Sequence, residues 1–237
     1  MTPSHPTLTK LHGGLIVSCQ ARPGSPLRDV RMIAAMAQCA ERGGAAGVRI
    51  DGPDDIAAVR RSVAFPIIGI QKIAGGPVYI TPTFDAARQV VWAGADIVAI
   101  QATRERAGTT DPLGPLIARV HEELAAPVMA DVSTLDEGIQ AAEAGADLVA
   151  TTMSGYTPHS PSMEGPDLTL IEELAGRLTI PVVAEGRIST PEEARAALHA
   201  GAWAVVVGRA ITMPEAITER FVKALAGGAR SAGESNA

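Results

Sequence analysis

The chain alternates between short apolar runs and longer segments with an amphipathic pattern. The runs are rich in Val and Ile and are apolar on both sides, which is typical of strands buried on both faces of a parallel sheet. We predict eight such strands, at residues 14–20, 46–50, 65–72, 96–100, 127–131, 147–151, 182–184 and 205–207.

The segments between these runs follow the period of helices with one apolar face. In the first of them, Val30, Ile33 and Ala37 fall on the same side. Thr134 followed by Glu137 forms a capping box, a pattern that begins helices. We predict helices at residues 27–42, 51–62, 83–93, 111–125, 134–144, 168–178 and 215–226, and one more that starts at Thr190-Pro191.

An internal repeat indicates how the strands are arranged. The even-numbered strands follow Gly43-Gly-Ala-Ala, Ala93-Gly-Ala-Asp, Ala144-Gly-Ala-Asp and Ala200-Gly-Ala-Trp. Strands three, five and seven begin with Pro66, Pro127 and Pro181. The repeating unit is thus two strand–helix pairs of roughly 50 to 60 residues, and four units close a (β/α)8 TIM barrel. An open doubly wound sheet is the alternative, but it would not require this regularity.

The predicted barrel spans residues 13–226 as a single α/β domain. Residues 1–12 are expected to be an extended lead-in, and residues 227–237 a disordered tail. A length of 237 residues fits one such barrel, a fold of about 250 residues, or two smaller domains. No linker interrupts the alternation, which favours the single barrel.

Composition narrows the function classes. Aromatic residues make up only 3% of the chain, so the core must be built from Ala, Val, Ile and Leu. The net charge of −6 argues against nucleic acid as a partner, but not against a phosphorylated small substrate, because a small anion responds to its local site. No apolar stretch could span a membrane and no signal peptide is evident, so we expect a cytoplasmic enzyme.

Two glycine–arginine pairs follow the last two strands: Gly186-Arg187 and Gly208-Arg209. A glycine after a strand lets the backbone approach a ligand, and the N–H groups at a following helix start suit an anion. Turns in these positions form the phosphate site common on (β/α)8 barrels. One pair alone would favour an ordinary turn, whereas two pairs favour a barrel of the phosphate-binding type.

Polar residues gather at the carboxyl ends of the predicted strands, where (β/α)8 enzymes hold their catalytic groups. In strand order they are Cys19 and Gln20, Arg49, Gln71 and Lys72, Gln101, Asp131, Thr151 to Ser154, and Glu185. Each alone could belong to a structural ion pair or hydrogen bond. Unpaired buried charges are costly, however, and a charged small ligand would account for them together.

Other chemistries find less support in the sequence. No predicted strand end carries a histidine, so no metal centre is expected there. Cys19 and Cys39 have no spacing that suggests zinc or a disulfide framework. Cys19 also lacks a strand-end histidine that could activate it as a nucleophile.

Six segments together resemble one enzyme family. They are Gly13-Gly-Leu-Ile-Val-Ser-Cys-Gln-Ala21, Gly69-Ile-Gln-Lys72, Tyr79-Ile-Thr-Pro-Thr83, Val128-Met-Ala-Asp-Val-Ser-Thr134, Thr151-Thr-Met-Ser-Gly-Tyr-Thr157 and Ala184-Glu-Gly-Arg-Ile188. They strongly resemble the N-acetylmannosamine-6-phosphate 2-epimerases of bacterial sialic-acid catabolism. The resemblance extends from residue 13 to the last helix, and several segments together are far more specific than the glycine turns alone.

The resemblance implies a reaction and a set of catalytic roles. N-acetylmannosamine 6-phosphate would be converted to N-acetylglucosamine 6-phosphate without a metal or an organic cofactor. Lys72 would be the catalytic acid/base and Glu185 its partner, with Gln20, Arg49 and Asp131 in the polar site around the substrate. Whether one group or two serve the two faces of carbon 2 stays open at this point.

The resemblance also implies contacts with the rest of the substrate. Ser154, Gly155 and Tyr156 would bind the sugar, and the two glycine–arginine turns its phosphate. Two alternatives remain, namely another phosphosugar or indole/imidazole-pathway enzyme on the same barrel, and a non-catalytic phosphosugar sensor. The oligomeric state is open, with a homodimer as one option.

Overall fold

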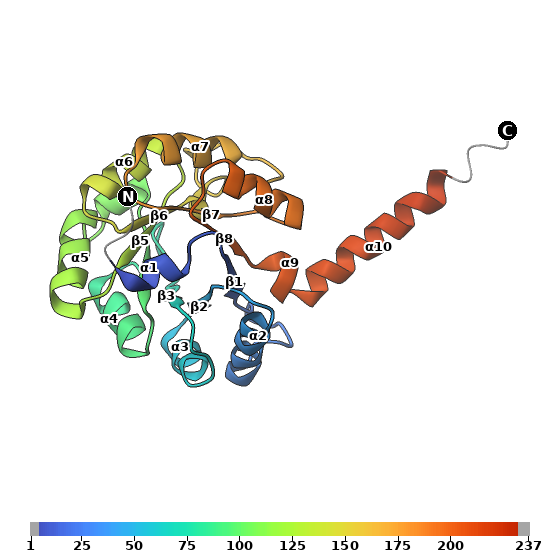
Figure 1. Ribbon diagram of the computed structural model, residues 1–237, viewed down its shortest axis with the longest axis horizontal. Coiled ribbons are helices and arrows are strands. Elements are labelled where there is room, and N and C mark those ends of the chain that lie inside the picture. The colour runs from blue at the N-terminus through green and yellow to red at the C-terminus, as the bar shows by residue number, and fades with distance from the viewer. Residues whose placement is uncertain (1–4, 232–237) are drawn as a thin grey trace.

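Eight parallel strands close into a barrel in the computed structural model, which describes residues 5–231 (Figure 1). Each strand pairs with its neighbours in sequence, and β1 pairs with β8 to complete the ring. The (β/α)8 prediction is therefore confirmed. The strands are β1 (Leu15–Cys19), β2 (Gly47–Asp51), β3 (Ile67–Ile70), β4 (Ile97–Gln101), β5 (Val128–Asp131), β6 (Leu148–Ala150), β7 (Val182–Glu185) and β8 (Ala204–Val207).

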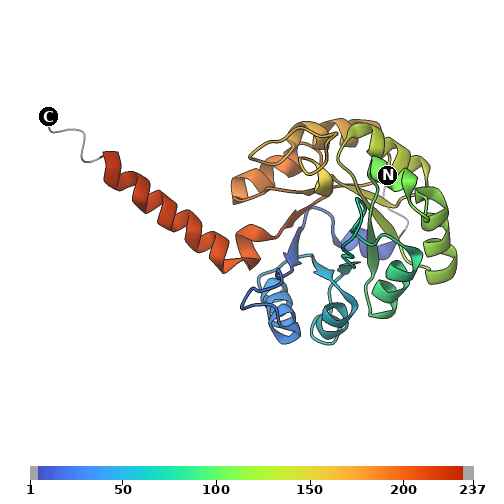
Figure 2. The same cartoon turned by 180° about the vertical axis from the view of Figure 1, so that it is seen from behind.

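Helices cover the outside of the barrel, one after most strands (Figures 1 and 2). They are α2 (Val30–Arg42), α3 (Pro53–Arg60), α4 (Phe84–Trp92), α5 (Leu113–Arg119) with its π-helical continuation η2 (Val120–Leu124), α6 (Leu135–Glu143), α7 (Leu168–Arg177) and α8 (Pro191–His199). Three short elements were not predicted: η1 (Arg104–Gly108), η3 (Thr151–Met153) and α9 (Arg209–Thr212). The predicted capping box of Thr134 and Glu137 is present at the start of α6.

The first described segment is a helix, not the extended lead-in expected for residues 1–12. Helix α1 (Pro6–Lys10) begins after His5, whose Nδ1 accepts a hydrogen bond from the N–H of Thr7 at 3.3 Å. Leu8 and Leu11 are fully buried and pack into the interior of the barrel. Burial of these two leucines stabilises the helix at this place, and the helix closes the amino-terminal end of the barrel. Residues 1–4 lie outside the described range.

Apolar side chains form two layers, one inside the barrel and one between the strands and the helices. Ile16, Ile68 and Leu148 belong to the inner layer, and Val48 and Val98 to the outer one. Gly69 allows the helices a close approach, because a Cβ there would lie 2.4 Å from Val90 Cγ1. The two layers together hold the strand ends, and hence the polar groups on them, in fixed positions.

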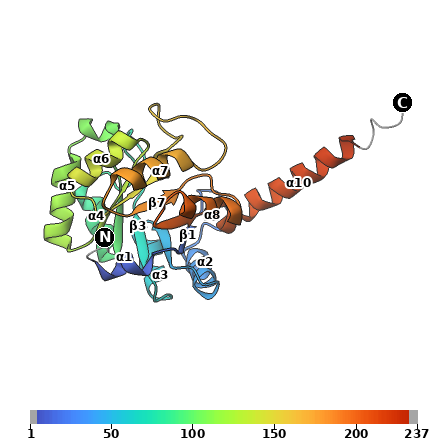
Figure 3. The same ribbon diagram turned by 45° about the horizontal axis from the view of Figure 1, so that its top comes forward.

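Helix α10 (Pro214–Ser231) leaves the barrel and projects away from it (Figures 1 to 3). It continues five residues beyond the predicted end near residue 226, into the segment that was expected to be disordered. The remainder of that segment, residues 232–237, lies outside the described range. Phe221 and Leu225, on this helix, are 69% and 75% exposed. Within residues 5–231, no helix is long and apolar enough to cross a membrane.

Candidate active site

A buried ion network lies where the carboxyl ends of the strands converge. Arg49, on β2, is 1% exposed and binds Asp131, on β5, through two parallel hydrogen bonds. Arg49 Nη1 donates to Oδ1 at 3.0 Å and Nη2 to Oδ2 at 2.5 Å. Nη1 also donates to Oε2 of Glu185, on β7, at 2.6 Å. Such charge-assisted, two-pronged bonds are the strong ones, and here they join three strands through one guanidinium.

Thr152, in η3, completes this network. Its Oγ1 donates to Asp131 Oδ1 at 2.6 Å and lies 3.2 Å from Glu185 Oε2. Burial disfavours the charge on Arg49, but the two carboxylates beside it raise its pKa above the ordinary value. Burial also disfavours the charged form of Glu185 and so raises its pKa, although the nearby Arg49 acts in the opposite direction. The three groups therefore pair with one another through one guanidinium, which is the structural ion pair that the sequence left open for each of them.

Lys72, two residues beyond the end of β3, lies beside the network and forms no ion pair with it among the described residues. The strand is shorter than predicted, so that Lys72 belongs to the loop after it. Its Nζ donates a hydrogen bond to Gln20 Oε1 and lies 3.7 Å from Asp51 Oδ2. The side chain is 43% exposed at the opening. Crowding by surrounding protein atoms lowers the pKa of Lys72, which Asp51 opposes and Arg49 reinforces.

Most polar groups of the loop between η3 and α7 form hydrogen bonds within the loop. Ser154 Oγ donates to Asp167 Oδ2 at 2.6 Å, and the N–H of Gly155 donates to Ser160 Oγ at 2.8 Å. Tyr156 is 61% exposed. Of the three predicted sugar-binding residues, Tyr156 therefore has the side chain that is most accessible to a ligand.

Arg187 also holds this loop. Its Nε donates to Gly165 O at 2.8 Å, its Nη1 donates to Ser154 O, and its guanidinium lies 5.4 Å from the centre of the Tyr156 ring. A Cβ on Gly155 would lie 2.5 Å from Arg187 Nη1, so that the glycine leaves room for the guanidinium. Backbone carbonyls do not neutralise a positive charge, and Arg187 can attract an anion while it orders the loop.

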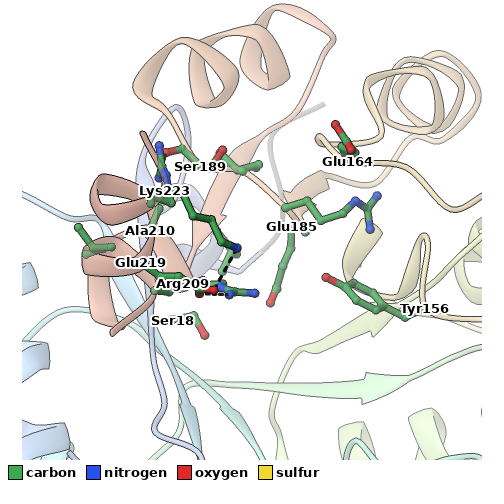
Figure 4. A pocket seen from close by; sticks show the side chains of 17 residues that line it. Ser18, Tyr156, Glu164, Glu185, Ser189, Arg209, Ala210, Glu219 and Lys223 are labelled. Carbon is green, nitrogen blue, oxygen red and sulfur yellow. Dashed lines mark hydrogen bonds and ion pairs between the residues drawn. The ribbon is translucent and has the colours of Figure 1, made fainter. Parts of the chain in front are cut away.

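A cavity of about 450 Å³ adjoins the ion network on the side of β7 and β8 (Figure 4). Glu185 forms part of its wall, so that the network and the cavity share a residue. Glycines and cations from the two predicted turns line it together with two cations from α10: Gly186, Arg187, Gly208, Arg209, Arg220 and Lys223. Three carboxylates line it as well, Glu164, Glu185 and Glu219. Glu219 pairs with Lys223 at 3.0 Å and with Arg209 at 3.8 Å.

The two glycine turns differ more than their sequences suggest. Gly208 is followed at once by α9, whose first N–H groups have no carbonyl partner within the helix. The Gly186 turn is followed by an extended segment instead, and α8 begins only at Pro191. The N–H groups of Ser189 and Thr190 before it donate to Glu193 Oε2, at 2.6 and 3.2 Å. The helix-start feature predicted for both turns is thus present at the second turn alone.

The chain is similar to known proteins along most of its length. A family model described as "Putative N-acetylmannosamine-6-phosphate epimerase" matches residues 33–227. This chain belongs to that epimerase family. A relative from Caldanaerobacter subterraneus, named "Putative N-acetylmannosamine-6-phosphate 2-epimerase", is 50% identical over 91% of this chain and 92% of its own length. A relative of the same name from Cutibacterium acnes is 48% identical over 92% of this chain and 96% of its own length.

A solved member of the epimerase family has the same fold. The N-acetylmannosamine-6-phosphate 2-epimerase from Clostridium perfringens superimposes with a TM-score of 0.88 at 40% identity, over 94% of this chain and 98% of that one. A thiamine phosphate pyrophosphorylase from Pyrococcus furiosus, at 20% identity and a TM-score of 0.61, shares the fold alone. The six segments that pointed to the epimerase family were therefore interpreted correctly.

Some residues of the site were not among the predicted ones. Asp51 was assigned to the start of a helix, yet it is the last residue of β2 and accepts a hydrogen bond from the N–H of Lys72 at 2.9 Å. Its position at a strand end was a usable signal. Arg220 and Lys223 gave none, because helix periodicity does not say which cavity a helix adjoins. Among residues 5–231, no cluster of His, Cys, Asp and Glu side chains is arranged to hold a metal ion.

The Arg49→Met variant should be markedly less stable, and more so at high pH. Loss of the guanidinium leaves Asp131 and Glu185 buried together, which typically costs about 3–5 kcal/mol. Burial already raises the pKa of Glu185, and loss of the opposing Arg49 charge would raise it further above the pKa in the unfolded chain. Stability is therefore lost as the pH rises from the unfolded-state pKa of Glu185 to its folded-state pKa, and partly recovered as the pH falls towards 5. Urea unfolding at pH 5 and pH 8 measures both effects.

Arg119→Met is the matched control for this experiment. Arg119 forms an exposed ion pair with Glu123 at 2.8 Å, one helical turn away, and its guanidinium lies 3.7 Å from the centre of the Phe84 ring. Exposed contacts of these two kinds contribute only about 0.3–1 kcal/mol each. An equally small and pH-independent loss in the Arg49 variant would show that the buried network does not stabilise the barrel.

Proposed function

We propose that this chain converts N-acetylmannosamine 6-phosphate to N-acetylglucosamine 6-phosphate by removing and returning the proton on carbon 2. The observation that supports this most directly is the position of Lys72. Its amine lies at the barrel opening, close to the ion network of Arg49. The chain that carries it belongs to the 2-epimerase family. We propose that this reaction, a step in the catabolism of a phosphorylated amino sugar, takes place in the cytoplasm.

The chemistry begins with the open-chain form of the sugar, since only then does an adjacent aldehyde acidify the carbon 2 proton. Neutral Lys72 accepts this proton, and the electron pair of the C–H bond moves into an enolate. A lowered pKa makes the neutral amine accessible near neutral pH. The positive charge of Arg49 favours both the neutral lysine and the negative enolate oxygen.

Return of a proton to the opposite face of carbon 2 completes the inversion. We assign Glu185 as the partner of Lys72 in this step, because burial raises its pKa and so favours a protonated carboxyl. Gln20 orients the amine through its hydrogen bond, and Asp131 holds Arg49 in place. If Lys72 serves both faces, Glu185→Gln keeps inverting carbon 2; if Glu185 supplies the second proton, that variant exchanges the proton without inversion.

The phosphate is proposed to bind in the cavity beside β7 and β8. Gly186 and Gly208 let the phosphate approach the backbone of the two turns, and Arg187 and Arg209 supply positive charge. Tyr156, on the loop above, and the backbone of Ser154 and Gly155 would contact the sugar. An anchor remote from the reacting carbon positions that carbon against Lys72.

The Lys72→Ala variant should lose turnover by about 100- to 10,000-fold, because removal of a general acid/base has that effect. In deuterated water, the wild-type product should carry deuterium at carbon 2, and the variant should neither turn over nor exchange. Proton NMR of the sugar measures both.

A lysine at the other end of the barrel supplies the control for this variant. Lys10, in α1, is exposed, and Lys10→Ala should exchange carbon 2 like the wild type. Near-normal turnover by Lys72→Ala would mean that lysine is not the base and would move the role to Glu185 or Asp131.

Removal of the phosphate anchor should affect kcat/KM strongly. Charge-assisted hydrogen bonds contribute ~1.5–3 kcal/mol each, so Arg209→Ala should lower kcat/KM for the 6-phosphate by about 10- to 150-fold. Unphosphorylated N-acetylmannosamine should already be a poor substrate, and the same substitution should leave its turnover unchanged. Equal efficiency with and without phosphate would exclude an anion site in the cavity.

A homodimer is proposed as the functional assembly, on the basis of the outer face of β1 and β8. Two adjoining apolar cavities of about 440 and 450 Å³ lie there, and both are lined by Leu15 and Ile211. In a (β/α)8 barrel the helix after β8 covers this face. Here α10 occupies that place in the sequence but projects away, with Phe221 and Leu225 exposed. Two copies can satisfy both surfaces by exchanging their α10 helices across a twofold axis.

The Leu225→Asp variant should therefore be monomeric at micromolar concentration, whereas the wild type should be a dimer, as measured by light scattering. Trp92→Asp is a matched control, because Trp92 is 73% exposed on α4, far from the proposed surface. It should leave the dimer intact. A monomeric wild type would exclude the exchange of α10.

A further inference from the structure

Directly after Lys72 the chain doubles back on itself. Residues 71–73 and 77–81 form the outgoing and return arms of a small hairpin, in which Lys72 pairs with Ile80 as an antiparallel bridge. Backbone hydrogen bonds of 2.9 Å flank this bridge on both sides. The position of the Lys72 backbone therefore depends on the return arm, which belongs to no helix and to no strand of the barrel.

Gln101, the last residue of β4, holds the return arm through its side chain. The amide is 1% exposed, and its Oε1 accepts hydrogen bonds from the N–H groups of Tyr79 at 2.9 Å and Ile80 at 3.4 Å. Its Nε2 donates to Pro77 O at 2.9 Å. The backbone N–H of Gln101 also donates to Ile80 O, at 3.0 Å. Gln101 thus bonds to three residues of the arm, Pro77, Tyr79 and Ile80.

Arg106, in η1, binds the end of the same arm. It is 2% exposed and donates only to backbone carbonyls: Gln101 O, Thr81 O at 3.2 Å, Pro82 O at 3.0 Å and Asp111 O at 3.2 Å. Thr81 has a φ of 44°, which a β-branched residue adopts only when its surroundings enforce it. No carboxylate among the described residues forms an ion pair with Arg106, and burial lowers its pKa to about 10.

A buried arginine without a counter-charge is costly to a fold and needs a compensating role. We infer that Gln101 and Arg106 are positioning residues for Lys72, which act by fixing the return arm against which Lys72 is paired. This inference rests on the proposed function, in which Lys72 moves the carbon 2 proton. Neither side chain is proposed to touch the substrate.

Two consequences follow for Lys72 when the arm is loosened. Its amine moves relative to carbon 2, and a misplacement of about 1 Å can cost on the order of 100-fold in rate. Water also reaches the amine more freely, which relieves its desolvation and raises its pKa. The charged groups around Lys72 are Asp51, Arg49, Glu185 and Asp131, and all of them remain in place.

The experiment compares Gln101→Met and Arg106→Gln with the wild type. We expect kcat to fall about 10- to 100-fold while KM and inhibition by inorganic phosphate change less than about 3-fold. The lysines of the chain are Lys10, Lys72 and Lys223, so NMR of ¹³C-labelled lysine gives few signals, and Lys72→Ala assigns the one of interest. The pKa of Lys72 should rise in both variants, and the acid limb of the kcat profile should move to higher pH with it.

Arg60→Gln is the control. Arg60 also donates to backbone carbonyls, Val63 O at 2.8 Å and Phe65 O at 3.0 Å, but lies at the opposite end of the barrel and, unlike Arg106, pairs with a carboxylate, Asp96, at 2.9 Å. It should lower stability without changing kcat or the pKa of Lys72. If Arg106→Gln does not fold, Gln101→Met decides. A kcat and a Lys72 pKa equal to those of the control would overturn the positioning role.

The NMR titration separates this inference from the proposed function. A wild type that does not epimerise the sugar would refute the function, while an unchanged Lys72 pKa in folded Gln101→Met and Arg106→Gln would refute the positioning role independently of activity.

Discussion

The bidentate pairing of Arg49 with Asp131 is the interaction on which the site depends. It is fully buried, and a third partner, Glu185, shares one of the guanidinium nitrogens. A buried ion pair contributes little net stability, since desolvation offsets most of the attraction. Its effect here is on geometry and on the local field, because three strands of the barrel must keep their register for the bonds to form.

That field accounts for the division of labour among the titratable groups. The positive charge of Arg49 lies close enough to Lys72 to add to the desolvation that lowers its pKa, while Asp51 acts in the opposite direction. Glu185 feels burial more strongly than the nearby guanidinium, and its pKa rises. A basic lysine and a protonatable carboxyl at one opening suit the proposed transfer of the carbon 2 proton.

The residues that support the site come from distant parts of the chain. Lys72 depends on a hairpin held by β4 and η1, and the cation-lined cavity draws Arg220 and Lys223 from the projecting helix α10. If α10 covers the barrel of a second copy, the same helix that joins the two chains also borders the proposed phosphate cavity. Assembly and substrate binding would then share one structural element.

Much of this protein was determined by local sequence patterns. Buried strands and amphipathic helices have distinct periods, and their regular alternation with small residues before even strands led to the closed barrel. The barrel rule then placed Arg49, Lys72, Asp131 and Glu185 at one opening, because parallel strands end on the same side. Tertiary structure alone decided how these groups pair. It also decided that α1 closes the barrel, that α10 leaves it, and that Gln101 holds a hairpin. Such features depend on contacts between residues far apart in the chain, and periodicity carries no information about them.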